Sequence, residues 1–245
     1  LAGDGYAQDT NQTFDVYVRS SYEIGPFADS TALIQDSATD FNGKALTIGQ
    51  LVGLNDKVLY GTASPSSTID DLAHGTFDDS RGPVMRLYWA FFHRMPDLGG
   101  LNYWVAKYDN GMTLKTVANN FAKSSEFKTK YGSVSNDAFI TLVYQNVLER
   151  NPDAAGHAHW VGRLSEGVTR GEMMTAFSES SEGIRKMRGE IDSVLHGLGM
   201  LHRLPTAAEF PGWVNFLEAN GGQDTEFLIL NILTSSTHAA VVAAG

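Results

Sequence analysis

The 245-residue chain contains no cysteine, no long apolar run and few basic side chains. Without cysteine it has no disulfide framework, no thiol nucleophile and no cysteine-ligated zinc. No apolar run approaches the roughly 18 residues that indicate a membrane-spanning helix. Lys and Arg number 18 against 28 Asp and Glu, a net charge of −10. Because cationic side chains supply most of the affinity for phosphate backbones, this balance argues against a nucleic-acid partner.

The common catalytic patterns are missing as well. The sequence has no HExxH, no GxSxG, no P-loop and no GxGxxG after a strand. We therefore predict no catalytic residue and no organic cofactor. Calcium is the metal that the sequence favours, because calcium prefers several oxygens from loops. Segment 64–80 (SPSSTIDDLAHGTFDDS) supplies four aspartates, Asp70, Asp71, Asp78 and Asp79. A solvated acidic loop without metal explains the same residues.

Three later segments repeat one another. They read RMPDLGGLNYW from Arg94, RNPDAAGHAHW from Arg150 and RLPTAAEFPGW from Arg203. In each, a proline follows the arginine by two residues and a tryptophan follows it by ten, and the tryptophans are Trp104, Trp160 and Trp213. A Ser-Ser pair comes about 20 residues further on, so the agreement indicates a tandem repeat. We predict repeats at residues 84–133, 134–188 and 189–245.

The spacing inside each repeat is helical. In segment 135–152 adjacent pairs of apolar residues recur every four residues, at 139–140, 143–144 and 147–148. This spacing places them on one side of an amphipathic helix. Ser135 or Asn136 can cap that helix, and Pro152 ends it. A second helix is expected after the N-cap residues Asp97, Asp153 and Thr206. It should end at Gly111 and Gly167, before a third helix that opens at Thr113 and Thr169.

These signals predict an all-α fold of tandem repeats, each with three to four short helices, packed into a compact array. Residues 1–83 hold 12 acidic and 4 basic side chains. We predict an acidic, partly irregular N-terminal region there, with traces of a degenerate repeat. Segment 17–26 resembles a first helix with its proline, with Ile34 where a tryptophan would fall, and LTIGQLVGL at 46–54 resembles VTRGEMMTA at 168–176.

The repeated residues resemble the bacterial domain-of-unknown-function 4214 family. The first copy reads Tyr88, Phe92, Arg94, Pro96, Asp97, Gly100, Trp104, Ser124, Glu126 and Phe127. The second has the same residue types except Leu148 for the phenylalanine of position 92 and Gly183 for that of position 127, and the third has Thr206, Glu209 and Thr237 at motif positions. The resemblance implies an α-helical module of secreted bacterial proteins, which accompanies surface-layer, adhesin and calcium-binding sequences. The repeated residues also resemble, more distantly, those of phycobilisome linker domains. It implies no catalytic residue.

The charged motif residues have a structural interpretation and a catalytic one. Arg94 with Glu126, and Arg150 with Glu182, can form ion pairs that tie the first helix of a repeat to its last. In the third repeat Arg203 lacks that partner, because Thr237 replaces the glutamate. The alternative makes Glu126 and Glu182 the carboxylate pair of a glycan hydrolase. Since such a pair needs two different environments, and equivalent repeat positions tend to share one, we favour the structural interpretation.

Aromatic residues supply the candidates for ligand binding. Trp104, Trp160 and Trp213 share one position of the repeat, which favours a role as core anchors. Trp104 or Trp160 stacking on a sugar is the alternative. Trp89 and Tyr103 are stronger candidates, because the second repeat replaces them by Gln145 and His159. A specialised site in a repeat protein is expected at such unrepeated positions.

Two classes of function remain. The first is a non-catalytic extracellular module that binds cell-envelope polysaccharide or other copies of itself, as in a surface layer or adhesin. The tandem repeat, the absence of cysteine, the acidic charge and the resemblance favour it. The second is a carbohydrate-active enzyme, which would need two non-equivalent carboxylates about 5–10 Å apart, such as Asp15 or Asp29 against Glu126 or Asp97. We favour the binding module, secreted to the bacterial surface; a spacer without a ligand is the third possibility.

Overall fold

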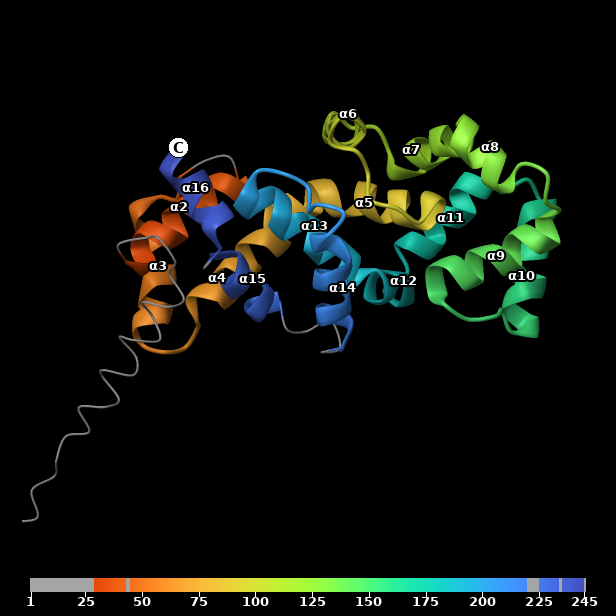
Figure 1. Cartoon of the computed structure of the whole chain (residues 1–245). Coiled ribbons are helices and arrows are strands. Elements are labelled where there is room, and N and C mark those ends of the chain that lie inside the picture. Colours follow the sequence, from red (N-terminus) through yellow and green to blue (C-terminus); the bar gives the residue numbers. More distant parts are fainter. Residues whose placement is uncertain (1–28, 43–44, 220–224, 234, 245) are drawn as a thin grey trace, which may run out of the picture. The chain divides into compact units, whose positions relative to one another are not determined.

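The computed structural model describes residues 29–42, 45–219, 225–233 and 235–244 (Figure 1). Within these ranges every regular element is a helix, fifteen α-helices and one π-helical turn, so the predicted all-α fold is confirmed. None of the helices in the described ranges is long and apolar enough to cross a membrane. The described residues divide into two compact units, one made of those up to residue 73, of 199–202 and of those from residue 225 on, the other of 74–198 and 203–219.

The second unit contains the first two repeats and the beginning of the third. The first repeat comprises α5 (Asp78–Phe92), α6 (Leu98–Asp109), α7 (Leu114–Phe121) and α8 (Ser125–Tyr131). The second comprises α9 (Asn136–Leu148), α10 (Ala154–Ser165), α11 (Arg170–Ser178) and α12 (Ser181–Lys186). The third begins here with most of α13 (Arg188–Leu201) and with α14 (Glu209–Ala219). Each complete repeat therefore has four helices in the same order, the upper end of the predicted range.

Capping residues set the helix boundaries that the sequence predicted. The side chains of Thr113, Ser135 and Thr169 each accept a backbone hydrogen bond at the start of α7, α9 and α11. The second helices of the first two repeats are followed by Gly111 and Gly167, with φ of 90° and 97°. These left-handed conformations are the ones that glycine adopts at little cost, which explains why the helices end there.

The core of the second unit is formed mainly by the first and third helices of the repeats. Helix α11 packs against α7, α5 and α9. Its Met173 and Met174 are fully buried, as are Phe91 of α5 and Phe139 of α9. The third helix of one repeat thus lies against the third helix of the next.

The first unit contains α2 (Ser30–Asn42), α3 (Ile48–Leu59), α4 (Pro65–Leu72), α15 (Thr225–Leu233) and α16 (Ser236–Ala244). Helix α4 packs against both α2 and α15, around buried residues that include Leu33, Ile34 and Ile69. The short π-helical turn Ala73–Phe77 follows α4 and is kinked at Gly75.

The expected degenerate repeat falls partly within the first unit. Segment 46–54 lies at the start of α3, and Thr47 forms a capping box with Gln50 as Thr169 does with Glu172 in α11. Ile34 lies in α2 and is buried. Segment 17–26 and Asp15 lie outside the described residues. The division into a region at 1–83 and three repeats at 84–133, 134–188 and 189–245 stays a prediction.

Candidate functional site

The repeated arginine ties the end of the first helix to the start of the fourth. Arg94 donates from Nε and Nη2 to both carboxylate oxygens of Glu126, each at 2.8 Å, and from Nη1 to the carbonyl of Met95 at 2.8 Å. The second copy has the same geometry, with Arg150 donating to Glu182 at 2.7 and 3.0 Å. The hydrogen bonds from arginine hold the pKa of each glutamate below its usual range. Both carboxylates therefore stay ionised in equivalent environments.

The arginine of the third repeat, Arg203, pairs with a different carboxylate. Arg203 donates to both carboxylate oxygens of Glu209 at 2.7 and 2.8 Å, and Glu209 also accepts from the backbone N–H of Thr206. These hydrogen bonds, led by those from Arg203, lower the pKa of Glu209 to about 2. Thr237, at the position of the missing glutamate, is exposed. The ion pair of the third repeat thus closes within the turn before α14.

A left-handed residue precedes each of these arginines. His93, Glu149 and His202 have φ of 53°, 56° and 52°, a conformation that costs a side-chain-bearing residue energy. The arginine that follows each of them donates to the carbonyl of the next residue, Met95, Asn151 or Leu204. The tight turn between the first and second helices is therefore the same in all three repeats.

The aspartate and glycine of the motif place the start of the second helix of a repeat next to a tyrosine of its first helix. Asp97 caps α6 by accepting from the N–H of Gly100 at 2.7 Å. A Cβ atom at Gly100 would lie 2.5 Å from the hydroxyl of Tyr88, so glycine is required for this approach. Asp153, Gly156 and Tyr144 repeat the arrangement. Burial raises the pKa of Tyr88 to about 12, so its hydroxyl stays protonated at neutral pH.

The repeated tryptophans are half-buried, and the first two lie against the third helices of their repeats. Trp104 contacts Phe121 at a centroid distance of 5.4 Å, and Trp160 contacts Phe177 at 5.3 Å. Trp213 in α14 is also half-buried. Trp104 and Trp160 thus anchor their helices, while part of each ring stays accessible.

The two unrepeated aromatic candidates lie in different surroundings. Trp89 in α5 is half-buried, with its ring 4.9 Å from that of His93 and 5.8 Å from that of Phe210 in α14. Tyr103 in α6 is 55% exposed. The structure therefore gives Trp89 packing partners inside the unit and presents Tyr103 to solvent.

The four aspartates considered for calcium are divided between the two compact units. Asp70 and Asp71 belong to the first, and Asp78 and Asp79 lie at the start of α5 in the second. Among the described residues, no group of three or more His, Asp or Glu side chains is placed to hold a metal ion. Asp78 instead lies 3.8 Å from Nη1 of Arg86.

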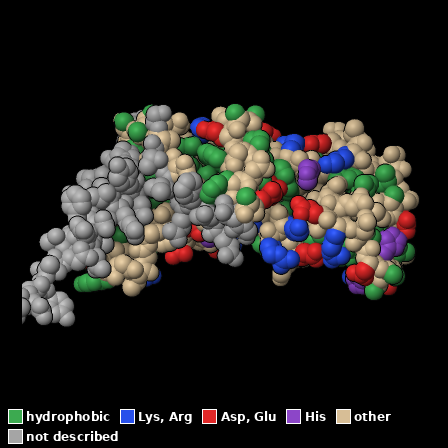
Figure 2. Space-filling view, turned by 60° about the horizontal axis from the view of Figure 1, so that its bottom comes forward, with side chains coloured by type: hydrophobic (Ala, Val, Ile, Leu, Met, Phe, Trp, Pro, Cys, Tyr) green, Lys and Arg blue, Asp and Glu red, His purple; other side chains and the backbone are tan. Residues whose placement is uncertain are grey.

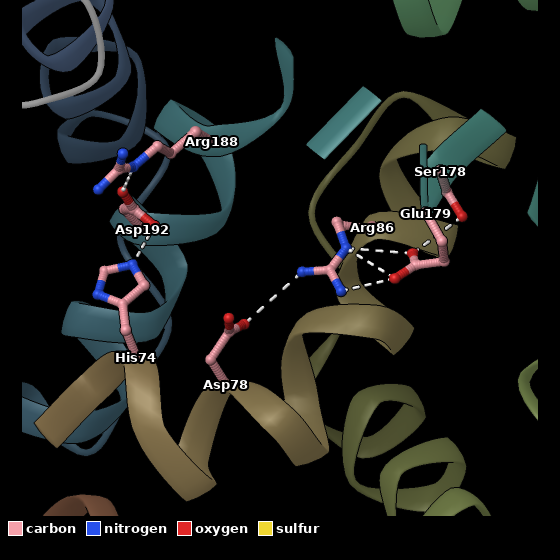
Figure 3. Close-up of polar contacts among 7 residues, drawn as sticks. All are labelled: His74, Asp78, Arg86, Ser178, Glu179, Arg188 and Asp192. Carbon is pink, nitrogen blue, oxygen red and sulfur yellow. Dashed lines mark hydrogen bonds and ion pairs between the residues drawn. The ribbon is translucent and has the colours of Figure 1, made fainter. Parts of the chain in front are cut away.

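A cluster of partly buried charges, absent from the motif, consists of two groups, one that ties α5 to the end of α11 and one that ties the π-helical turn Ala73–Phe77 to α13 (Figure 3). Arg86 of α5 donates to Glu179 at 3.1 Å from Nε and 2.7 Å from Nη2, and Ser178 donates to Glu179 at 3.1 Å. Asp192 of α13 is 2% exposed and pairs with His74 at 3.0 Å and Arg188 at 3.2 Å. On the surface, by contrast, Figure 2 shows acidic and basic side chains interspersed on the face in view.

Comparison of the repeats explains how the sequence could have indicated this cluster. The spacing of the repeated arginines aligns Arg86 with Leu142, and Asp192 with Phe139. Polar residues thus replace apolar ones at positions of the first helix. Unrepeated aromatic positions alone do not reveal this cluster, whereas unrepeated polar positions would have indicated it.

Glu190, two residues before Asp192 on α13, is a buried carboxyl whose pKa is strongly raised. It is 8% exposed, and burial raises its pKa to about 7, with smaller contributions from the negative charges of Glu218, Glu149 and Asp192. Its folded pKa lies above the unfolded value, so between pH 4.5 and about 7 the unfolded chain loses a proton that the folded protein keeps. The contribution of Glu190 to stability is present below this window and is lost as the pH rises through it.

We expect Glu190→Gln to remove this pH dependence. A pKa raised from 4.5 to about 7 corresponds to about 3 kcal/mol. Relative to the wild type, the variant should be similar in free energy of unfolding at pH 5 and more stable by about 3 kcal/mol at pH 8. Urea unfolding followed by tryptophan fluorescence measures this in the second unit, which contains all four tryptophans. Glu166→Gln, at an exposed position whose charge is not among those that raise the pKa of Glu190, is the control. Parallel pH profiles for wild type and Glu190→Gln would contradict the assignment.

Comparison with known families identifies the repeat. The family model described as "Domain of unknown function (DUF4214)" matches the chain twice, at residues 78–130 and 118–187. The matches span α5 to α12, with both Arg–Glu pairs between first and fourth helices. No curated protein matches the chain, and no solved structure does.

Proposed function

Residues 78–187 of the chain belong to the DUF4214 family, and from this premise we propose that the protein is a non-catalytic binding module that recognises cell-envelope glycan at the bacterial surface. The exposed ring of Tyr103 is the observation that carries the proposal. Sugars present C–H faces that pack on aromatic rings, so an accessible tyrosine is a suitable platform.

The surroundings of Tyr103 support a stacking role. Its neighbours on the outer side of α6, Gly99 and Ala106, are small and exposed, so they leave the ring accessible. The ammonium of Lys107 lies 5.6 Å from the ring centroid, and the ring of Trp104 contacts it edge-on at 5.0 Å. These contacts orient the ring and place a hydrogen-bond donor beside it.

The ionised state of the motif carboxylates favours binding over hydrolysis. A glycan hydrolase needs one carboxyl that donates a proton and another that stays ionised. Glu126 and Glu182 are each held by two arginine hydrogen bonds, and both pKa values are lowered. Equivalent, ionised carboxylates suit a structural role.

Retention on isolated bacterial envelope polysaccharide tests the proposal. We expect the wild type to be retained without release of new reducing ends, and Tyr103→Ala to bind about tenfold more weakly, a loss of about 1.4 kcal/mol. Leu98→Ala, a truncation on the same helix at a residue 41% exposed, should bind as the wild type does. Loss of retention under chelator would add calcium to the site. Release of oligosaccharides would contradict the proposal and favour the hydrolase, whereas absence of retention would leave a spacer.

A further inference from the structure

Helix α3 exposes an apolar face. Eight large hydrophobic side chains are exposed in the described part of the chain, and four of them lie on this helix or at its C-cap: Ile48 at 82%, Val52 at 52%, Leu59 at 64% and Tyr60 at 80%. No residue of α3 is buried. Helical geometry places Ile48, Val52 and Leu59 on one side of the helix, with Gly49 and Gly53 next to them. An exposed apolar face of this kind marks an interaction site.

The corresponding helix of the second repeat is covered. Helices α3 and α11 both begin after a threonine whose side chain forms a capping box, Thr47 in one and Thr169 in the other. Each has a glycine two residues after that threonine, Gly49 and Gly171. In this register Val52 aligns with Met174, which is fully buried.

Another third helix covers α11 at its glycine. A Cβ atom at Gly171 would lie 2.9 Å from the backbone nitrogen of Asn119 in α7, so the two helices approach backbone to backbone there. Thr169 also donates to the side chain of Asn119 at 2.7 Å. At Gly49, by contrast, a Cβ atom would meet no atom of the described residues within 4 Å. The surface that receives a helix in the second repeat is present on α3 and open.

We propose that this face of α3 binds α3 of a second copy of the chain and forms a two-fold symmetric dimer. Helix α7 already lies against α11, whereas α3 combines the glycine and the open apolar face, so the matching surface on another copy is α3 itself. A contact between identical surfaces is isologous, the commonest arrangement of homodimers.

The charges of α3 suit an antiparallel pairing. The helix carries only Asp56 and Lys57, so it adds no net charge to the contact in an otherwise acidic chain. A two-fold axis near Val52 brings Asp56 beside the N-terminal end of the partner helix, where the helix dipole is positive. The two Asp56 side chains are then separated by about 12 Å along the helix axis, at 1.5 Å of rise per residue.

Light scattering and sedimentation of the full chain over a range of concentrations test the dimer. We expect Gly49→Leu to raise the dimer Kd at least tenfold, because the new side chain blocks the close approach. Gly162→Leu in α10 is the matched control, since a Cβ atom at that helical glycine also meets nothing within 4 Å. Both variants should keep the wild-type melting temperature at dilutions where the wild type is monomeric. A monomeric wild type at all concentrations, or equal dimerisation of Gly49→Leu, would overturn the inference.

Cross-linking tests the symmetry. Because the chain has no cysteine, Val52→Cys introduces a single thiol next to the proposed axis. Oxidation should join it rapidly to the same residue of a second copy, whereas Ile184→Cys, at a residue 40% exposed on α12, should form no covalent dimer. A dimer that Val52→Cys fails to cross-link would refute α3 as the contact.

The dimer is independent of the proposed glycan binding. Self-association was the other role expected of this chain, and the dimer does not require a glycan. A monomer retained on polysaccharide would therefore overturn only this inference, and a dimer that is not retained only the proposed function.

Discussion

Glu179→Ala is expected to lower the free energy of unfolding of the second unit by about 3–5 kcal/mol, because it leaves the buried Arg86 guanidinium without its hydrogen-bonded carboxylate. The Arg86 side chain is 10% exposed, and Asp78, at 3.8 Å, is too distant to replace Glu179. Urea unfolding monitored by tryptophan fluorescence at pH 7 measures the loss.

The double variant Arg86→Leu/Glu179→Ala separates the unpaired charge from lost packing. Leu142 occupies the position of Arg86 in the second repeat, so leucine suits this helix face. Replacing both partners removes the buried charge, and we expect most of the lost stability to return. If the double variant were no more stable than Glu179→Ala, the unpaired guanidinium would not be the cause.

Phe121→Ala is expected to destabilise the second unit by about 3–5 kcal/mol, as is typical of deleting a buried aromatic side chain. Phe121 is 3% exposed and contacts four rings: Tyr88 at 4.8 Å, Phe91 at 5.5 Å, Phe92 at 5.3 Å and Trp104 at 5.4 Å. Its removal leaves a cavity lined by all four rings. The same fluorescence-detected unfolding experiment measures the effect.

Phe177→Ala is the matched comparison, because Phe177 occupies the same place in the second repeat. At the four equivalent positions of the second repeat, Phe177 finds two rings, Tyr144 and Trp160. The other two positions hold Val147 and Leu148, where the first repeat has Phe91 and Phe92. Aromatic pairs contribute about 0.5–1.5 kcal/mol each beyond burial, so Phe121→Ala should cost at least about 1 kcal/mol more. Equal losses would show that cavity size alone decides the stability.

Local signals made much of the fold predictable. Capping side chains, prolines and glycines act on the backbone within a few residues, so Ser135, Pro152 and Gly167 could be assigned from sequence. The ion pair of Arg94 with Glu126 spans 32 residues but was visible because it is repeated. Repetition supplied the long-range information that a single sequence otherwise lacks.

The buried charges could not be predicted in the same way. Arg86 and Glu179 are 93 residues apart, and His74 and Asp192 are 118 apart, and neither pair has a copy elsewhere in the chain. Their meeting depends on how α5, α11 and α13 pack. Likewise, nothing in the sequence placed Phe210 next to Trp89, which gives that tryptophan packing partners within the unit.

The ion pair of Arg203 with Glu209 changes what the repeated arginine holds together. In the first two copies the arginine fastens the fourth helix, through Glu126 or Glu182. In the third, Arg203 pairs with Glu209 only six residues away, and α15 and α16 belong to a different compact unit from α14. Because the acidic partner of Arg203 lies at the start of α14 itself, this arginine stabilises only its own turn and leaves the helices that follow without the tie found in the first two copies.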